Sequence, residues 1–262
     1  MKPQPVPALS GRGAVVTGGG RGIGEAIARS LARAGAAVVV AARTTAEIER
    51  VAAALAQGGA AAFAEACDVT REDDVKRLAE RARGRLGRVD ILINNAGASS
   101  SAPLHKVTLE EWDHALAVNV TSAFLCTREF LPDMVERGWG RVVNVGSRAG
   151  LEGARYVGPY SAAKHALIGL TRSVALEVAG RGVTVNVVCP GYVDTKMTER
   201  TLAHVEQRTG HSPQEALAAV LATTGQQRLI APDEVALEVL RLCGEGAHDL
   251  NGQAIVVEDR AP

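Results

Sequence analysis

The chain has 262 residues, 47% of them hydrophobic, and its 29 basic residues balance 29 acidic ones. That length is enough for a buried core, while the charge balance argues against nucleic acid or an anionic membrane surface as a partner. The most apolar stretch, AGAAVVVAA, is too short to span a bilayer, and the proline-containing N-terminus has no apolar signal region. We therefore expect a soluble, cytoplasmic protein.

Short apolar runs rich in β-branched residues alternate along the chain with longer segments of helical period. We expect strands near residues 14–18, 36–42, 60–66, 91–95, 141–147, 183–189 and 253–258. Helices are expected between them, for example over 24–35 and 45–59, where glycines end the periodic pattern. Strands that are apolar throughout are typical of parallel sheets covered on both faces. The sequence thus predicts one doubly wound α/β domain over residues 1–262.

The first expected strand runs directly into TGGGRGIG at 17–24, which opens the first expected helix. Gly18, Gly22 and Gly24 would permit a tight turn and a close approach of the backbone to a phosphate at the helix N-terminus. Glycine clusters also occur in ordinary flexible loops, so glycine content alone is weak. The position between strand and helix is what indicates a dinucleotide site.

The end of the second expected strand lacks the carboxylate that would bond the 2′-hydroxyl of an adenosine ribose, and reads Ala42-Arg43 instead. A guanidinium at this position favours a 2′-phosphate through charge-assisted hydrogen bonds. Arg21, within the glycine turn, adds positive charge nearby. We therefore expect NADP(H) to be preferred, with NAD(H) possible; the alternative is that Arg43 is a solvated residue that opens a loop.

Tyr160 and Lys164 are four residues apart in a segment of helical character, so they share one helix face. Taken alone, such a pair is more often a packed tyrosine beside a solvated lysine than a proton-transfer pair. Its interpretation depends on the other motifs of the chain.

Seven motifs occur in order: TGGGRGIG at 17–24, CDV at 67–69, NNAG at 94–97, Asn119 in AVNV, Ser147 in VGS, Tyr160-x-x-x-Lys164, and PGYVDT at 190–195. Through them nearly the whole chain resembles the short-chain dehydrogenase/reductase family, in its compact single-domain branch. Within that family it is most similar to reductases of 3-oxoacyl thioesters and polyketide-type ketones. The resemblance implies a Rossmann-type, seven-stranded, mostly parallel sheet with helices on both faces, and a homotetramer or homodimer.

The resemblance also implies a catalytic tetrad of Asn119, Ser147, Tyr160 and Lys164. Asp68 and Val69 would contact the adenine, and Val193 and Thr195 would hold the nicotinamide carboxamide. With the glycine turn and Arg43, the expected cofactor-binding residues are Thr17, Gly18, Arg21, Gly22, Ile23, Gly24, Arg43, Asp68, Val69, Asn95, Ala96, Gly97, Tyr160, Lys164, Pro190, Gly191, Val193 and Thr195. No metal is expected, and the four scattered cysteines should be free, buried thiols.

Hydride transfer to a ketone leaves negative charge on oxygen, so an acid must deliver a proton. A free phenol has a pKa of about 10, and a nearby ammonium favours the phenolate. We therefore expect Lys164 to lower the pKa of Tyr160, the proton donor, and Ser147 to hold the substrate oxygen. From the family alone, Asn119 should bend its helix and help position a water that connects Lys164 to solvent.

Two other functions stay open: an NAD-dependent dehydrogenase that oxidises a secondary alcohol or hydroxyacyl thioester, and a nonenzymatic, NADP-sensing regulator. Substrate choice is expected to depend on a lid at about 193–228. Arg148 and Arg155 are candidates to meet an anionic or polar substrate. The C-terminal LNGQAIVVEDRAP lacks the glycine pair that commonly follows this strand in relatives, which leaves the subunit arrangement open.

Overall fold

The structure is a computed structural model that describes residues 8–259; part of the proline-containing N-terminus and the last three residues lie outside the described residues. The strands are β1 (Gly13–Thr17), β2 (Ala37–Ala42), β3 (Ala62–Ala66), β4 (Ile91–Asn94), β5 (Gly140–Val145), β6 (Val183–Pro190) and β7 (Ala254–Val257). The α-helices are α1 (Gly22–Arg33), α2 (Thr45–Gln57), α3 (Glu72–Leu86), α4 (Leu109–Leu116), α5 (Ser122–Glu136), α6 (Gly158–Glu177), α7 (Lys196–Thr209), α8 (Pro213–Ala222) and α9 (Pro232–Cys243).

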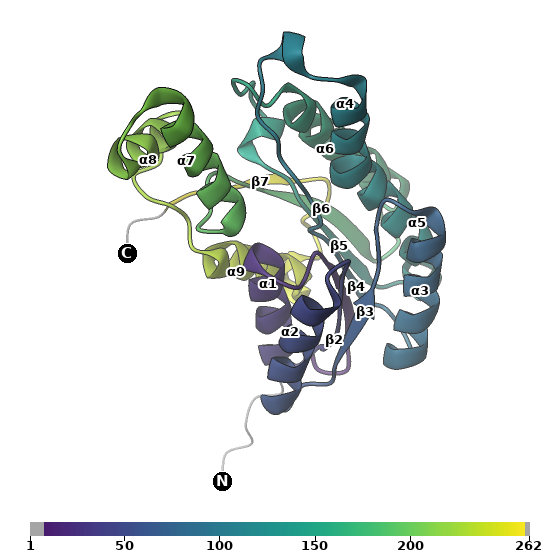
Figure 1. The fold of residues 1–262 in the computed structure, drawn as a ribbon. Helices are drawn as coiled ribbons and strands as arrows, with labels where there is room; N and C mark the ends of the chain where they lie inside the picture. Colours follow the sequence, from purple (N-terminus) through teal and green to yellow (C-terminus); the bar gives the residue numbers. More distant parts are fainter. Residues whose placement is uncertain (1–7, 260–262) are drawn as a thin grey trace.

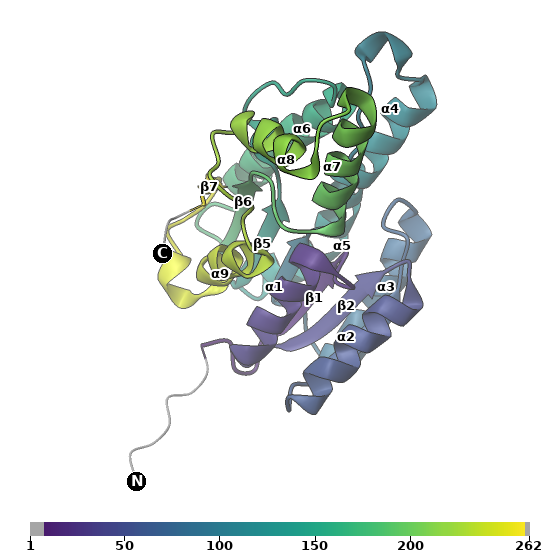
Figure 2. The same cartoon turned by 60° about the vertical axis from the view of Figure 1, so that its left-hand side comes forward.

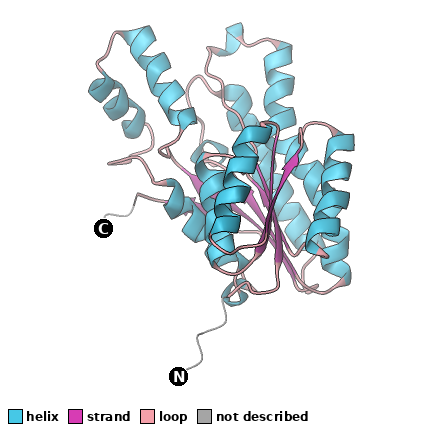
Figure 3. Ribbon diagram, turned by 60° about the horizontal axis from the view of Figure 1, so that its bottom comes forward, coloured by secondary structure: helices cyan, strands magenta, loops and turns pink. Residues whose placement is uncertain are grey.

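The seven strands form one sheet in the order β3-β2-β1-β4-β5-β6-β7, and every pair of neighbours is parallel. Figure 3 shows the strands between two layers of helices, and Figure 1 shows α1, α2 and α9 on the side opposite α3 and α5. The predicted doubly wound sheet of seven strands is confirmed. The strand expected over 141–147 ends two residues earlier, at Val145, although the backbone N–H of Gly146 still donates to the Val188 carbonyl of β6 at 2.7 Å.

Two hydrophobic cores lie on the two faces of the sheet. Alternate residues of one strand serve both, since Val16 packs with Ile27 of α1 while Val15 packs with Leu78 of α3. A strand buried on both faces can carry β-branched apolar residues at successive positions, which is the pattern that the sequence shows. The sheet is therefore a rigid frame for the loops at its ends.

The strand order reverses between β1 and β4, which are hydrogen-bonded neighbours. In open parallel sheets ligands bind outside the carboxyl ends of the strands at such a reversal. The glycine turn follows β1 at this edge, and NNAG begins at the last residue of β4. Topology thus brings together two motifs that are far apart in the sequence.

The segment expected as a lid contains α7 and α8, which stand at the end of the molecule where α4 and the start of α6 also lie (Figures 1 and 2). Ser212 caps α8 by accepting a hydrogen bond from the backbone N–H of Glu215 at 3.4 Å. Whether this segment moves stays a prediction. Between residues 8 and 259, none of the helices has both the length and the apolar content needed to cross a membrane.

Candidate active site

The glycine turn after β1 is held in shape by side chains from the neighbouring strand. Gly18 and Gly22 have φ angles of 63° and 53°, a backbone region that favours glycine. The Thr17 hydroxyl accepts hydrogen bonds from the backbone N–H groups of Asn95 (3.0 Å) and Ala96 (3.2 Å). The Asn95 amide donates to the Gly18 carbonyl at 3.1 Å. The turn that begins α1 is therefore a fixed cradle of backbone, suited to a phosphate at the helix N-terminus.

The two arginines expected near the adenosine end of the cofactor differ in their surroundings. Arg21 forms an ion pair with Glu47 of α2, with 3.1 Å between Nη1 and Oε1. Its charge is thus partly neutralised, which the sequence did not indicate. Arg43 forms no hydrogen bond or ion pair with any other residue between 8 and 259.

A cavity of about 480 Å³ lies beside Arg43, at the ends of β2 and β3 and the start of α3. Asp68 lines this cavity, and its carboxylate also accepts hydrogen bonds from the backbone and hydroxyl of Thr70. Val69 is buried beside it. The lining residues are Arg43, Ala66, Cys67, Asp68, Arg71, Asp74, Arg77, Leu78 and Arg81. The unpaired guanidinium of Arg43 beside open space fits a phosphate substituent on an adenosine.

Tyr160 and Lys164 lie on one face of α6, as their spacing predicts. The Lys164 ammonium nitrogen is 5.6 Å from the centre of the Tyr160 ring and donates a hydrogen bond to the Val145 carbonyl at 2.7 Å. Val145 is the last residue of β5, so this bond fixes the lysine at the carboxyl edge of the sheet. Lys164 is 3% exposed, and burial lowers its pKa to about 8.

Ser147 follows β5 and begins a short 3-10 helix, η3 (Arg148–Gly150), where its hydroxyl accepts from the backbone N–H of Ala149 at 3.2 Å. The Ser161 hydroxyl of α6 donates to the Ala149 carbonyl at 2.6 Å and so fixes η3 against α6. This contact brings Ser147 close to Tyr160, where the serine side chain acts to lower the pKa of the phenol. The serine is both a helix cap and a neighbour of the phenol.

The expectation that Lys164 lowers the pKa of Tyr160 is wrong. Burial raises the pKa of Tyr160, and the hydrogen bond from Ser147 opposes that rise without cancelling it. Removing a phenolate from water destabilises its charge, and this effect exceeds the attraction of its surroundings. The phenol therefore keeps its proton at neutral pH.

Asn119 lies in a short π-helix (Ala117–Thr121) between α4 and α5, so the helix is locally widened there, and the expected bend stays a prediction. Its amide nitrogen donates to the carbonyls of Ala98 (2.8 Å) and Ala115 (2.9 Å). A β-carbon on Gly97 would lie 2.9 Å from Asn119 Oδ1 and 3.7 Å from Lys164 Nζ. The loop after β4 therefore lies between the asparagine and the lysine.

The PGYVDT turn after β6 faces the glycine turn. A β-carbon on Gly22 would lie 3.3 Å from the methyl group of Thr195, and Val193 is buried beneath this contact. Pro190 is the last residue of β6, and Ile23 packs at the margin of the core below α1. The structure thus gathers the expected tetrad and both ends of the expected cofactor site along one edge of the sheet.

Sequence reasoning missed several polar contacts near this edge. Arg148, a candidate to meet substrate, instead donates to the Thr224 carbonyl and forms an ion pair with Glu152. Asn94 donates to Asn144 on the adjacent strand at 2.8 Å, on the face of the sheet that α5 and α6 cover. The paired asparagines near the ends of two apolar strands were a visible signal, whereas nothing in the sequence links Arg148 to Thr224.

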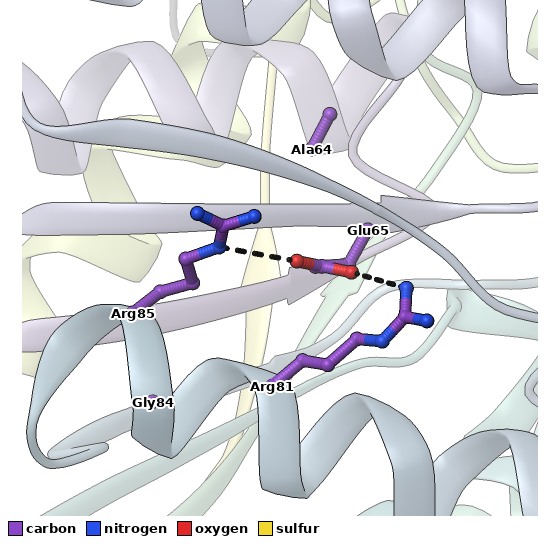
Figure 4. Close-up of a pocket in the computed structure, with 5 residues that line it drawn as sticks. All are labelled: Ala64, Glu65, Arg81, Gly84 and Arg85. Atoms are coloured by element: carbon purple, nitrogen blue, oxygen red, sulfur yellow. Dashed lines mark hydrogen bonds and ion pairs between the residues drawn. The ribbon is translucent and has the colours of Figure 1, made fainter.

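A second cavity, of about 470 Å³, lies away from the tetrad, against the edge strand β3 (Figure 4). Arg81 and Arg85 reach from α3 toward the buried carboxylate of Glu65, at 3.0 and 3.6 Å. This second cavity contains none of the expected site residues, and its charged lining forms the ion pairs with Glu65. The four cysteines are free and buried, and no group of three or more metal-ligating side chains occurs between residues 8 and 259.

Comparison with known proteins gives a consistent result. The family model described as short chain dehydrogenase matches residues 12–206. D-beta-hydroxybutyrate dehydrogenase of Rhizobium meliloti is 36% identical over 251 residues, covering 94% of this chain and 96% of that protein. 3-Oxoacyl-[acyl-carrier-protein] reductase of Synechocystis is 42% identical over 194 residues, covering 73% and 78%. A variant of actinorhodin polyketide ketoreductase solved with NADPH has a TM-score of 0.90 at 36% identity, covering 94% and 95%.

Proposed function

The chain belongs to the short-chain dehydrogenase family, and we propose that it is an NADPH-dependent oxidoreductase that reduces a ketone to a secondary alcohol. One observation carries this proposal: the Tyr160 phenol lies within reach of both Ser147 and Lys164, at the edge of the sheet where the glycine turn opens. The ketoreductase and oxoacyl reductase among the similar proteins support the direction of the reaction.

We infer that the glycine turn would hold the pyrophosphate and Arg43 the 2′-phosphate of NADPH. The fit rests on the backbone cradle around Gly18 and on the unpaired guanidinium beside the cavity. When bound, NADPH supplies the hydride that reduces the carbonyl carbon. Lys164 and Thr195 would bind the nicotinamide end, because both lie close to the loops after β4 and β1.

Tyr160 would donate the proton that the carbonyl oxygen requires. Because burial raises its pKa, the phenol is protonated at neutral pH and suits reduction better than oxidation, which needs a phenolate base. Ser147 would hold the carbonyl oxygen against the phenol. Lys164, whose pKa of about 8 leaves it mostly charged at neutral pH, would stabilise the phenolate left behind. Asn119 would position the loop beside Lys164 through its bonds to Ala98.

The substrate class that we propose is a 3-oxoacyl thioester or a related polyketide-type ketone. The test is NADPH oxidation by purified protein against 3-oxoacyl thioesters, diketones, cyclic ketones and aryl ketones. Tyr160→Phe should lower kcat by about 10²- to 10⁴-fold while NADPH binding is kept. Tyr156→Phe, at a tyrosine that is 61% exposed, is the matched control and should leave kcat unchanged.

Near-normal turnover by Tyr160→Phe would overturn the proposed mechanism. Tight NADPH binding without turnover on any ketone would favour a nucleotide-sensing regulator instead. A ratio of kcat/KM values that prefers NAD⁺ and a secondary alcohol over NADPH and a ketone would favour the dehydrogenase.

We further propose that the enzyme is cytoplasmic and works as a homotetramer or homodimer. Exposed apolar side chains on neighbouring helices support an assembly, since Phe124 of α5 is 42% exposed and Leu176 of α6 is 79% exposed. Light scattering on the purified protein would measure the assembly, and a monomer at micromolar concentration would contradict it.

A further inference from the structure

The two ends of the segment that contains α7 and α8 are joined to each other. The entry turn Tyr192–Thr195 and the exit segment Thr223–Ile230 form a short parallel bridge between Val193 and Ile230. The backbone N–H of Ile230 donates to the Tyr192 carbonyl at 3.0 Å, and that of Asp194 donates to the Ile230 carbonyl at 2.9 Å. The entry turn and the exit segment are therefore joined into a base beside the site, and α7 and α8 extend from this base.

Gln226 lies in the middle of this base, is only 7% exposed, and uses the full bonding capacity of its amide. Its oxygen accepts from the Tyr192 backbone N–H and from the Thr224 hydroxyl, both at 2.7 Å. Its nitrogen donates to the carbonyls of Tyr192 and Arg228, both at 3.1 Å. A β-carbon on Gly191 would lie 2.1 Å from the amide oxygen, so the amide lies directly on the peptide backbone of the turn.

Two of the three residues that bond this amide, Tyr192 and Thr224, adjoin the reacting groups. Tyr192 lies two residues beyond β6, and Ser147 lies two residues beyond β5, the strand paired with it. The Tyr192 side chain also raises the pKa of Tyr160. The Thr224 carbonyl accepts a hydrogen bond from Arg148, the residue after Ser147. The Gln226 amide thus connects the turn after β6 with the loop that carries the serine, through a part-buried network in which the amide makes all four of its hydrogen bonds.

We infer that Gln226 is a positioning residue for ketone reduction, which holds the Tyr192 turn and the lid exit against Tyr160 and Ser147. The inference rests on the proposed function for its kinetic consequence only. A small displacement of the groups around a reacting carbonyl lowers the rate strongly, by up to about 10²-fold for 1 Å. A buried amide that binds both the N–H and the carbonyl of one residue prevents such a displacement.

The test compares Gln226→Met, which keeps the side-chain length and removes all four hydrogen bonds, with Gln227→Met at the exposed neighbouring position. In Gln226→Met the backbone N–H of Tyr192 loses its acceptor, so a peptide covering 190–194 should exchange its amide hydrogens faster than in the wild type. In Gln227→Met the same peptide should exchange at the wild-type rate. Turnover is divided by the concentration of NADPH-binding sites, measured by titration, so that only folded protein is counted. On this basis Gln226→Met should lower kcat by about 10- to 100-fold. Its Kd for NADPH should stay within about twofold.

Wild-type exchange together with wild-type kcat in Gln226→Met would overturn the inference. If Gln226→Met does not fold, Thr224→Val removes one hydrogen bond to the amide and should lower kcat by about three- to tenfold. Unchanged hydrogen exchange and unchanged kcat in Thr224→Val would equally overturn the inference. Hydrogen exchange needs no substrate. An absence of turnover in the wild type would therefore contradict the proposed function and leave the exchange result to decide whether Gln226 holds the turn.

Discussion

Replacing Lys164 by methionine should separate stability from activity in this protein. The ammonium is 3% exposed, and its pKa is lowered from 10.5 to about 8 by burial. The folded state therefore holds this proton less tightly than the unfolded chain does. Below pH 8 both states are protonated, and the buried charge lowers the free energy of unfolding. As pH rises from 8 toward 10.5 the folded state loses the proton first, and that destabilisation is relieved.

The size of the effect follows from the two pKa values. Relative to a neutral side chain, the charge lowers the free energy of unfolding by about 3 kcal/mol at pH 7 and by about 1 kcal/mol at pH 10. Methionine also leaves the Val145 carbonyl without its hydrogen bond, which costs about 1–3 kcal/mol at every pH. The variant should thus equal or exceed the wild type in stability at pH 7, by about 0–2 kcal/mol, although its turnover should be lost.

The measurement is chemical denaturation of cofactor-free protein at fixed concentration between pH 7 and pH 10. The difference in unfolding free energy between Lys164→Met and wild type should change by about 2.5 kcal/mol across this range, in favour of the wild type at high pH. Lys106→Met, at an exposed lysine, should give a difference that does not vary with pH. Parallel pH curves for wild type and Lys164→Met would refute the reasoning.

Three further predictions concern the proposed cofactor site and the base of the segment that contains α7 and α8. Arg43→Asp should shift the ratio of kcat/KM values from NADPH toward NADH, because a carboxylate repels the 2′-phosphate and bonds a 2′-hydroxyl. Gly24→Ala would place a β-carbon 2.2 Å from the Gly18 carbonyl oxygen, so it should weaken NADPH binding by at least about tenfold, measured by fluorescence titration. The control Gly84→Ala, where a β-carbon meets only open space, should instead stabilise the fold by about 0.5–1 kcal/mol. The Glu234 carboxylate pairs with Arg228, and this ion pair lowers the pKa of Glu234 to about 2. Glu234→Gln should therefore destabilise the protein at pH 7. In an acid titration the difference in unfolding free energy between the variant and the wild type should disappear as pH falls from about 4.5 to 2.

The fold could be predicted because its determinants are local and repeated. Each strand carries apolar residues at successive positions, and glycines end the helices, so the element order follows from short windows of sequence. The parallel arrangement then follows from the alternation of strand and helix. The shared face of Tyr160 and Lys164 was predictable for the same reason, since spacing along one helix fixes it.

The charge state of the site was not predictable from spacing. The sign of the change in the Tyr160 pKa depends on how completely the fold removes the phenol from water, and an i, i+4 pair does not report this. Partner choice was equally hidden. Arg21 pairs with Glu47 and Arg148 with the Thr224 carbonyl, contacts set by helices that pack from distant parts of the chain.

The missing glycine pair at the C-terminus has a structural counterpart at the base of the segment that contains α7 and α8. After β7, the carboxylate of Asp259 accepts hydrogen bonds from the backbone N–H groups of Gln227 (2.6 Å) and Arg228 (3.3 Å). The exit segment is thus bound on one side to the Tyr192 turn, through Gln226, and on the other to Asp259 after β7, where glycine would offer no side-chain acceptor. Because the base is fixed from both sides, we expect this segment to bend at the exposed connection between α7 and α8, where Gly210 has a φ of 74°. Substrate selection is therefore expected to depend on the side chains of α7 and α8 above a fixed base.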